Sequence, residues 1–231
     1  MSAAAPARPL VVARVLHALV ALAAGAGVAT ELVRALVEDP GDAGTTGERV
    51  VRLLSYFTIQ SNVLVLVASA LLAARPARAG RVVAVLHLDA LLCIAVTGVV
   101  YHAVLAGAGL PLTPSGAVAN LLLHTVAPVG AWLAWLLVGP RPRFGGATVG
   151  WAVVFPLAWI AYTFLHGAAS GWYPYPFLDV GAIGYGAAAL NTAAVAAGFL
   201  VLAALVRPLE RVLPGTPRVP GAAPGPEAPA V

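Results

Sequence analysis

The stretch LLSYFTIQSNVLVLV, residues 53–67, joins an apolar second half to a first half that carries six hydrogen-bonding side chains. The apolar half continues into residues 68–74 and has the character of a membrane-spanning helix. In hydrocarbon, an unsatisfied polar group costs several kcal/mol. The segment therefore predicts a spanning helix whose polar half faces other protein groups or a water-filled cavity rather than lipid.

The composition extends the membrane assignment to the whole chain. Of the 231 residues, 61% are hydrophobic and 10% are charged, whereas a soluble domain has about 25% charged residues. The formal charge of +4 does not indicate a nucleic-acid partner, because the arginines lie in predicted loops and at predicted helix ends. The single cysteine, Cys93, excludes a disulfide framework and a metal cage built from thiolates.

Apolar runs of about 20 residues are long enough to cross a bilayer. Six such runs occur, at residues 13–36, 51–74, 82–105, 117–138, 148–169 and 181–206. We therefore predict an all-α polytopic membrane protein, a six-transmembrane-helix bundle at 13–207, with an N-terminal segment at 1–12 and a Pro/Gly-rich, largely disordered tail at 208–231. The basic front of the first run resembles a signal peptide. Its apolar run is longer than usual, so we expect it to be retained.

The arginines predict an orientation. With six spans, ten of the 13 arginines fall on the side that holds both termini. The other side holds Glu38, Asp39, Asp42, Glu48 and an uncharged third loop. Because positive loops remain in the cytoplasm, we expect both termini to be cytoplasmic and the protein to lie in the plasma membrane.

This orientation places the polar side chains of several spans at similar depth. At about 1.5 Å per helical residue, Thr58 lies roughly 10 Å below the outer end of the second span. His124 lies equally deep in the fourth. Helical spacing predicts shared faces for three sets of residues: Ser55, Thr58 and Asn62; Asn120 and His124; Tyr162 and His166. With His102, they predict a polar pocket that opens towards the outer half of the membrane, above an apolar floor suited to an acyl chain.

The candidate chemistry is limited by what the pocket lacks. Familiar hydrolase motifs are missing, and acidic residues are nearly absent at this depth. Thr58 as nucleophile and His124 as base form the remaining dyad, with Asn62, Asn120 or a backbone N–H as oxyanion donor. Both features also have a purely structural explanation. The Thr58 hydroxyl would bond the backbone carbonyl one turn earlier, and the two asparagines would only link helices.

Three segments resemble the androgen-induced-gene / androgen-dependent TFPI-regulating protein family. They are FTIQSN at 57–62, NLLLHTVAP at 120–128 and GWYPYPFLDVGAIG at 171–184. Members of this family are multipass membrane threonine hydrolases of lipid esters, including fatty acid esters of hydroxy fatty acids. The resemblance implies that Thr58 is the nucleophile and that His124 is the essential histidine.

We therefore expect a hydrolase of lipid (fatty acyl) esters, without cofactor or metal, whose substrate enters from the bilayer. Tyr173, Tyr175 and Asp179 are expected to shape the pocket mouth, unless their segment is only a proline-stiffened interfacial loop.

Two alternatives remain open. One is a zinc hydrolase that uses His102, His124 and His166 as ligands. The other is a lipid-binding or transport protein without chemistry. The sequence predicts no oligomeric state.

Overall fold

The computed structural model describes residues 8–108 and 112–215, which are mostly helical and contain no β-strand. Six helical segments are long and apolar enough to cross a membrane: Arg8–Val37, Phe57–Ala74, Arg81–Leu105, Pro114–Val138, Gly146–Ser170 and Val180–Val212. The predicted all-α fold with six spans is therefore confirmed. Most of the predicted disordered tail, residues 216–231, lies outside the described residues, as do residues 1–7 of the predicted N-terminal segment.

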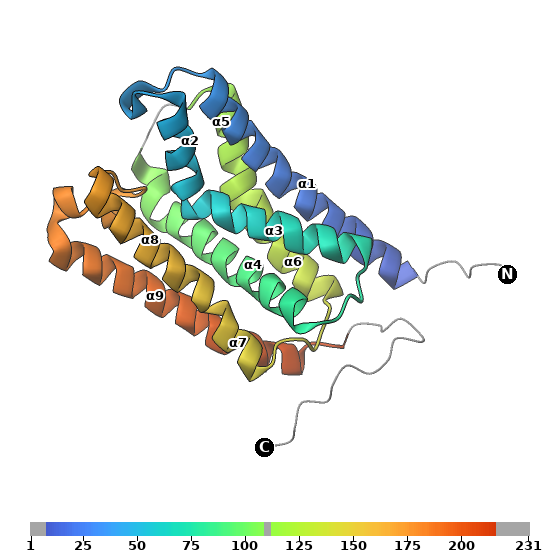
Figure 1. Cartoon of the computed structure of the whole chain (residues 1–231). Helices are drawn as coiled ribbons and strands as arrows, with labels where there is room; N and C mark the ends of the chain where they lie inside the picture. Colours follow the sequence, from blue (N-terminus) through green and yellow to red (C-terminus); the bar gives the residue numbers. More distant parts are fainter. Residues whose placement is uncertain (1–7, 109–111, 216–231) are drawn as a thin grey trace.

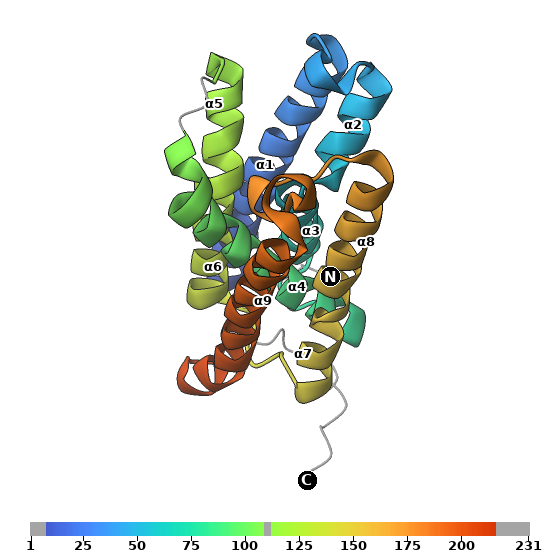
Figure 2. The ribbon, with the colours of Figure 1, turned by 90° about the vertical axis from the view of Figure 1, so that its left-hand side faces the viewer.

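The helices run along one bundle axis (Figures 1 and 2). They are α1 (Arg8–Val37), α2 (Thr46–Ser55), α3 (Phe57–Ala74), α4 (Arg81–Val100), α5 (Pro114–Leu121), α6 (Ala127–Val138), α7 (Gly146–Ala152), α8 (Val154–Ser170) and α9 (Val180–Val212). A π-helical turn, Tyr101–Leu105, extends α4, and a second, Leu122–Val126, joins α5 to α6. The start of α1 and the end of α9 lie at the same end of the bundle, the end that also carries α7 (Figure 1).

The second span differs from the predicted continuous helix at 51–74. It is interrupted at Tyr56, which has an extended conformation (φ −67°, ψ 130°) between α2 and α3. Tertiary contacts compensate for the break, because the Trp159 indole donates to the Ser55 carbonyl at 3.0 Å and the Tyr56 ring packs edge-on against Trp172. Thr58 therefore lies in the first turn of α3 rather than inside a longer helix.

The helices are unequally buried. In its most apolar window α4 has 67% of its residues inside the protein, whereas α8 and α9 have 22% and 17%. The centre of the bundle is therefore α3 and α4, with α1 and α6 packed against them. Helices α8 and α9 lie at one side of the bundle (Figure 1). Because their exposed side chains are mostly apolar, these two helices suit contact with lipid.

The α7 end of the bundle is tied together by buried polar groups. Glu210, near the end of α9, accepts the backbone N–H groups of Arg143 and Phe144 at 3.0 and 2.8 Å. Arg141 donates to the carbonyl groups of Trp135 and Leu136, which end α6. Glu210 thus satisfies two backbone N–H groups ahead of α7, and Arg141 satisfies the Leu136 carbonyl in the last turn of α6.

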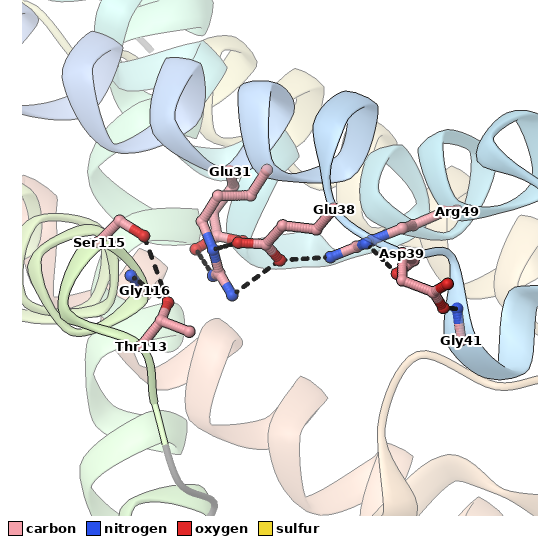
Figure 3. A network of polar contacts seen from close by, with 9 residues as sticks. Glu31, Glu38, Asp39, Gly41, Arg49, Thr113, Ser115 and Gly116 are labelled. Carbon is pink, nitrogen blue, oxygen red and sulfur yellow. Dashed lines mark hydrogen bonds and ion pairs between the residues drawn. The ribbon is translucent and has the colours of Figure 1, made fainter.

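The opposite end carries a network of ion pairs (Figure 3). The Arg34 guanidinium lies 2.8 Å from a carboxylate oxygen of both Glu31 and Glu38. Glu38 also accepts from Arg49 at 2.7 Å, and Arg52 pairs with Glu48 at 3.0 Å. The arginines of this end are thus neutralised by neighbouring carboxylates.

Gly167 allows the loop between α8 and α9 to fold back onto α8. A Cβ at this position would lie 2.1 Å from a ring carbon of Tyr173, so a larger residue forces that ring and the loop outward. We predict that Gly167→Ala lowers the free energy of unfolding by about 1–3 kcal/mol, as overpacking does. Thermal unfolding in detergent measures the change. Gly150→Ala, where an added Cβ meets open space, is the matched control and should not be destabilised.

Candidate functional site

Two side chains that are far apart in the sequence meet at the start of α3. Thr58 lies in the first turn of that helix, and His124 lies in the π-helical turn between α5 and α6. The Thr58 Oγ1 atom is 3.3 Å from His124 Nε2. Thr58 is buried and His124 is half-buried. The contact places the hydroxyl within hydrogen-bonding distance of the imidazole, the arrangement from which a general base takes a proton.

The second ring nitrogen of His124 determines the direction of that hydrogen bond. His124 Nδ1 lies 3.1 Å from the backbone carbonyl oxygen of Asn120. A carbonyl oxygen only accepts, so Nδ1 carries the proton and Nε2 presents its lone pair to the Thr58 hydroxyl. The Tyr101 ring stacks on the imidazole at 4.1 Å, and the Asn120 amide donates to the Tyr101 hydroxyl. The imidazole is thus held as a base for Thr58.

The backbone around His124 has a local cause in the sequence. Pro128 follows four residues later and has no N–H for the carbonyl of His124, with which its ring would clash in a regular α-helix. The turn is widened, and the Ala127 N–H bonds the Leu122 carbonyl instead. Gly98 of α4 makes room for it, since a Cβ there would lie 3.1 Å from Pro128. Such π-helical turns are frequent at functional sites.

Asn62 joins the two halves of the site. Its Nδ2 atom donates to the Thr58 carbonyl at 2.8 Å and to the Leu123 carbonyl at 3.2 Å. Both amide hydrogens are therefore used, and Asn62 is not free to stabilise an oxyanion in this arrangement. Ser61 adds a bond to the Thr58 carbonyl at 3.1 Å. Asn62 acts as a brace that positions Thr58 relative to the turn of His124.

Ser55 does not share a helical face with Thr58, because the chain breaks between them at Tyr56. The predicted i, i+3, i+7 face is wrong at its first member. The Ser55 hydroxyl instead donates to the Val51 carbonyl at 2.8 Å and lies 2.7 Å from the Tyr162 hydroxyl. Tyr162 stacks on His166 as its i, i+4 spacing implies, with ring centroids 5.5 Å apart.

The three histidines of the zinc alternative have separate partners. His102 is exposed and lies 3.1 Å from the Thr125 hydroxyl, and His166 is 3.4 Å from that of Ser170. Across residues 8–108 and 112–215, no group of three or more His, Cys, Asp or Glu side chains could hold a metal ion. The arrangement of these histidines therefore does not support a zinc site.

The three residues expected at the pocket mouth have different positions. Asp179 accepts the Ala182 N–H at 3.2 Å and caps α9. Tyr173 packs on α8, edge-on to Phe164. Only Tyr175 reaches the dyad: its hydroxyl oxygen lies 3.2 Å from both the backbone nitrogen and the Oγ1 of Thr58. The sequence does not predict this contact, because nothing in the spacing of residues 58 and 175 links them.

An open apolar cavity with a volume of about 130 Å³ begins at Thr58 and Tyr175. It lies between the central helices α3 and α4 and the peripheral helices α8 and α9. Its lining is mostly aliphatic and aromatic, with Val96, Val100, Leu157, Ile160, Phe164, Val195, Ala196, Phe199 and Leu200 among its members. Thr58 therefore borders a space that suits a hydrocarbon chain.

The comparisons with known proteins leave the site to be interpreted from its own geometry. No protein-family model, curated protein or solved structure matches this chain.

Proposed function

We propose that this protein is an intramembrane hydrolase of lipid (fatty acyl) esters, with Thr58 as nucleophile and His124 as general base. The observation that carries the proposal is the 3.3 Å contact between Thr58 Oγ1 and the unprotonated nitrogen of His124. The adjoining apolar cavity supplies room for an acyl chain. The resemblance to the androgen-induced-gene / androgen-dependent TFPI-regulating protein family supports the same two residues.

The reaction follows from these contacts. His124 Nε2 takes the hydroxyl proton as Thr58 Oγ1 attacks the ester carbonyl carbon. Collapse of the tetrahedral intermediate breaks the bond to the leaving alcohol, which receives the proton from His124. Water then attacks the acyl-threonine, His124 takes a proton from it, and the carboxylic acid leaves as Thr58 regains its hydroxyl. The cycle needs no metal or cofactor.

The membrane setting follows from charge and exposure. The α7 end of the bundle carries most of the arginines, while those at the other end are paired with carboxylates. The positive-inside rule therefore supports a cytoplasmic location of both termini, with Thr58 towards the outer half of the cell membrane. The exposed helices α8 and α9 border the cavity, so an ester would enter from the bilayer, with fatty acid esters of hydroxy fatty acids or related lipids as candidate substrates.

A fluorophosphonate probe tests the proposal on the purified, full-length protein. We expect one adduct, which peptide mass spectrometry locates at Thr58. It should disappear in Thr58→Ala and be greatly reduced in His124→Ala. Thr192→Ala is the matched control, since Thr192 also lines the cavity but its hydroxyl bonds the Ala188 carbonyl. An adduct elsewhere, together with full ester hydrolysis by Thr58→Ala, would disprove the proposal.

The cavity predicts an effect on chain length. Ala196 lines it, whereas the neighbouring Ala197 is exposed on the outer side of α9. We predict that Ala196→Phe shifts the preferred acyl chain of p-nitrophenyl esters to shorter lengths, with kcat/KM for the longest chains reduced about tenfold, a size typical of pocket discrimination. Ala197→Phe should leave the profile unchanged. Equal profiles for the two variants would place the acyl chain outside this cavity.

The same cavity also suits a lipid-binding or transport protein without chemistry. The two functions differ in turnover. A binding protein retains lipid stoichiometrically and releases it unchanged, and its binding does not depend on His124.

A further inference from the structure

The Tyr175 hydroxyl occupies a position that a packing role does not require. Tyr175 is 8% exposed, yet its oxygen lies 3.2 Å from the Thr58 backbone nitrogen and 3.2 Å from Thr58 Oγ1. It therefore contacts the atom that attacks the ester under the proposed function, on which this inference rests.

The donors and acceptors around Tyr175 form one consistent chain. The Thr58 N–H only donates, so the Tyr175 oxygen accepts from it. The Thr58 hydroxyl proton is directed to His124 Nε2, which leaves Tyr175 to donate its own proton to Thr58 Oγ1. In the resting state the phenol O–H thus points at the nucleophile.

The surrounding loop holds the phenol in place. The Tyr175 ring stacks on Phe177 at 5.2 Å and meets Tyr56 edge-on at 5.5 Å. Pro174 and Pro176 flank it, and Asn191 of α9 donates to the Phe177 carbonyl at 2.9 Å. Burial raises the pKa of Tyr175 to about 12, so the hydroxyl keeps its proton near neutral pH. A fixed, protonated donor is what charge stabilisation requires.

The start of α3 strengthens this donor. Its N-cap residue, Tyr56, makes no side-chain capping bond, so the amide of Thr58 is available to Tyr175. The N-terminal end of a helix carries a partial positive charge. By accepting from this amide, the Tyr175 oxygen is polarised, and its own proton becomes a stronger donor.

We propose that Tyr175 is a third catalytic residue, which donates a hydrogen bond to the oxyanion of the tetrahedral intermediate. As Thr58 Oγ1 bonds to the carbonyl carbon, the C=O π electrons move onto the carbonyl oxygen. That oxygen is then a near neighbour of Oγ1, within reach of the Tyr175 O–H. The phenol keeps its proton throughout, while His124 transfers the proton of Thr58 to the leaving alcohol.

Tyr175→Phe tests this role, because it removes the hydroxyl and keeps the ring. We expect kcat to fall about 10²–10³-fold, as loss of one oxyanion donor does, with KM changed less than about threefold. The fall should be equal for p-nitrophenyl and alkyl esters, because an oxyanion donor acts independently of the leaving group. Tyr173→Phe is the matched control on the same loop and should retain full activity.

A purely structural role predicts different results. If Tyr175 only caps α3, Tyr175→Phe lowers the unfolding temperature and raises KM, while kcat of the folded fraction stays within about threefold; this outcome overturns the proposal. Should Tyr175→Phe fail to fold, 3-fluorotyrosine in place of Tyr175 keeps the hydroxyl and changes its acidity. A kcat that follows this acidity supports the donor, and a kcat indifferent to it does not.

Failure of this inference is distinguishable from failure of the proposed function. Fluorophosphonate labelling of Thr58 in the wild-type protein reports on the dyad alone. If Thr58 is labelled and Tyr175→Phe hydrolyses esters at the wild-type rate, Tyr175 is not catalytic and the dyad stands.

Discussion

Thr58→Ala is expected to abolish ester hydrolysis, with kcat reduced at least about 10⁴-fold. The substitution removes Oγ1, the proposed attacking atom. The neighbouring Ser61 hydroxyl cannot replace it, because it donates to the Thr58 carbonyl and lies 2.8 Å from the Thr97 hydroxyl. Hydrolysis of a p-nitrophenyl ester by protein purified in detergent measures the change.

Thr58→Ser is the informative companion to this variant. It keeps an oxygen at the same position and loses only a methyl group, so we expect kcat within about tenfold of the wild type. If Thr58→Ala and Thr58→Ser lose activity equally, the Thr58 hydroxyl is not the nucleophile.

His124→Ala is expected to lower kcat by about 10²–10⁴-fold, the usual contribution of a general base. Thr58 would keep its hydroxyl but lose the acceptor that is 3.3 Å away. Added imidazole should restore part of the rate, since removal of the ring leaves space between Thr58 and the stacked Tyr101. Both rates are read from the same ester assay.

His102→Ala provides the control for this second prediction. His102 is exposed and bonds only the Thr125 hydroxyl in the described structure, so its loss should change kcat less than about threefold. A larger effect at His102 than at His124 would contradict the dyad.

The fold was accessible from sequence because long apolar runs have few alternatives in a bilayer. Six runs predicted six spans, and the helix ends moved by only a few residues. The break at Tyr56 was not predictable in the same way. Residues 51–74 form one apolar run, and the contact that compensates for the break comes from a distant residue, Trp159, whose indole N–H donates to the Ser55 carbonyl.

Part of the site could also be predicted from the sequence, because the spans define the depth of each residue. Depth along two spans brought Thr58 and His124 to one level, and the structure places them in contact. The roles of Asn62 and Tyr175 depend on three-dimensional contacts between residues 58, 123 and 175. A proline four residues after His124 was a signal for the irregular turn, since proline disturbs the preceding helical turn.

The interruption at Tyr56 also affects whether Thr58 lies near water or within the hydrocarbon layer. Helix α3 has 18 residues and is therefore about 27 Å long, close to the thickness of the hydrocarbon layer. If α3 spans this layer, Thr58, in its first turn, is expected near the boundary between hydrocarbon and water. Under the proposed function, the fatty chain would remain in the bilayer while water, which is scarce deeper in the hydrocarbon layer, would reach the acyl-threonine from the aqueous side. An uninterrupted helix over 51–74 would instead place Thr58 deeper in the hydrocarbon layer, where the proposed acyl-threonine would meet less water to hydrolyse it.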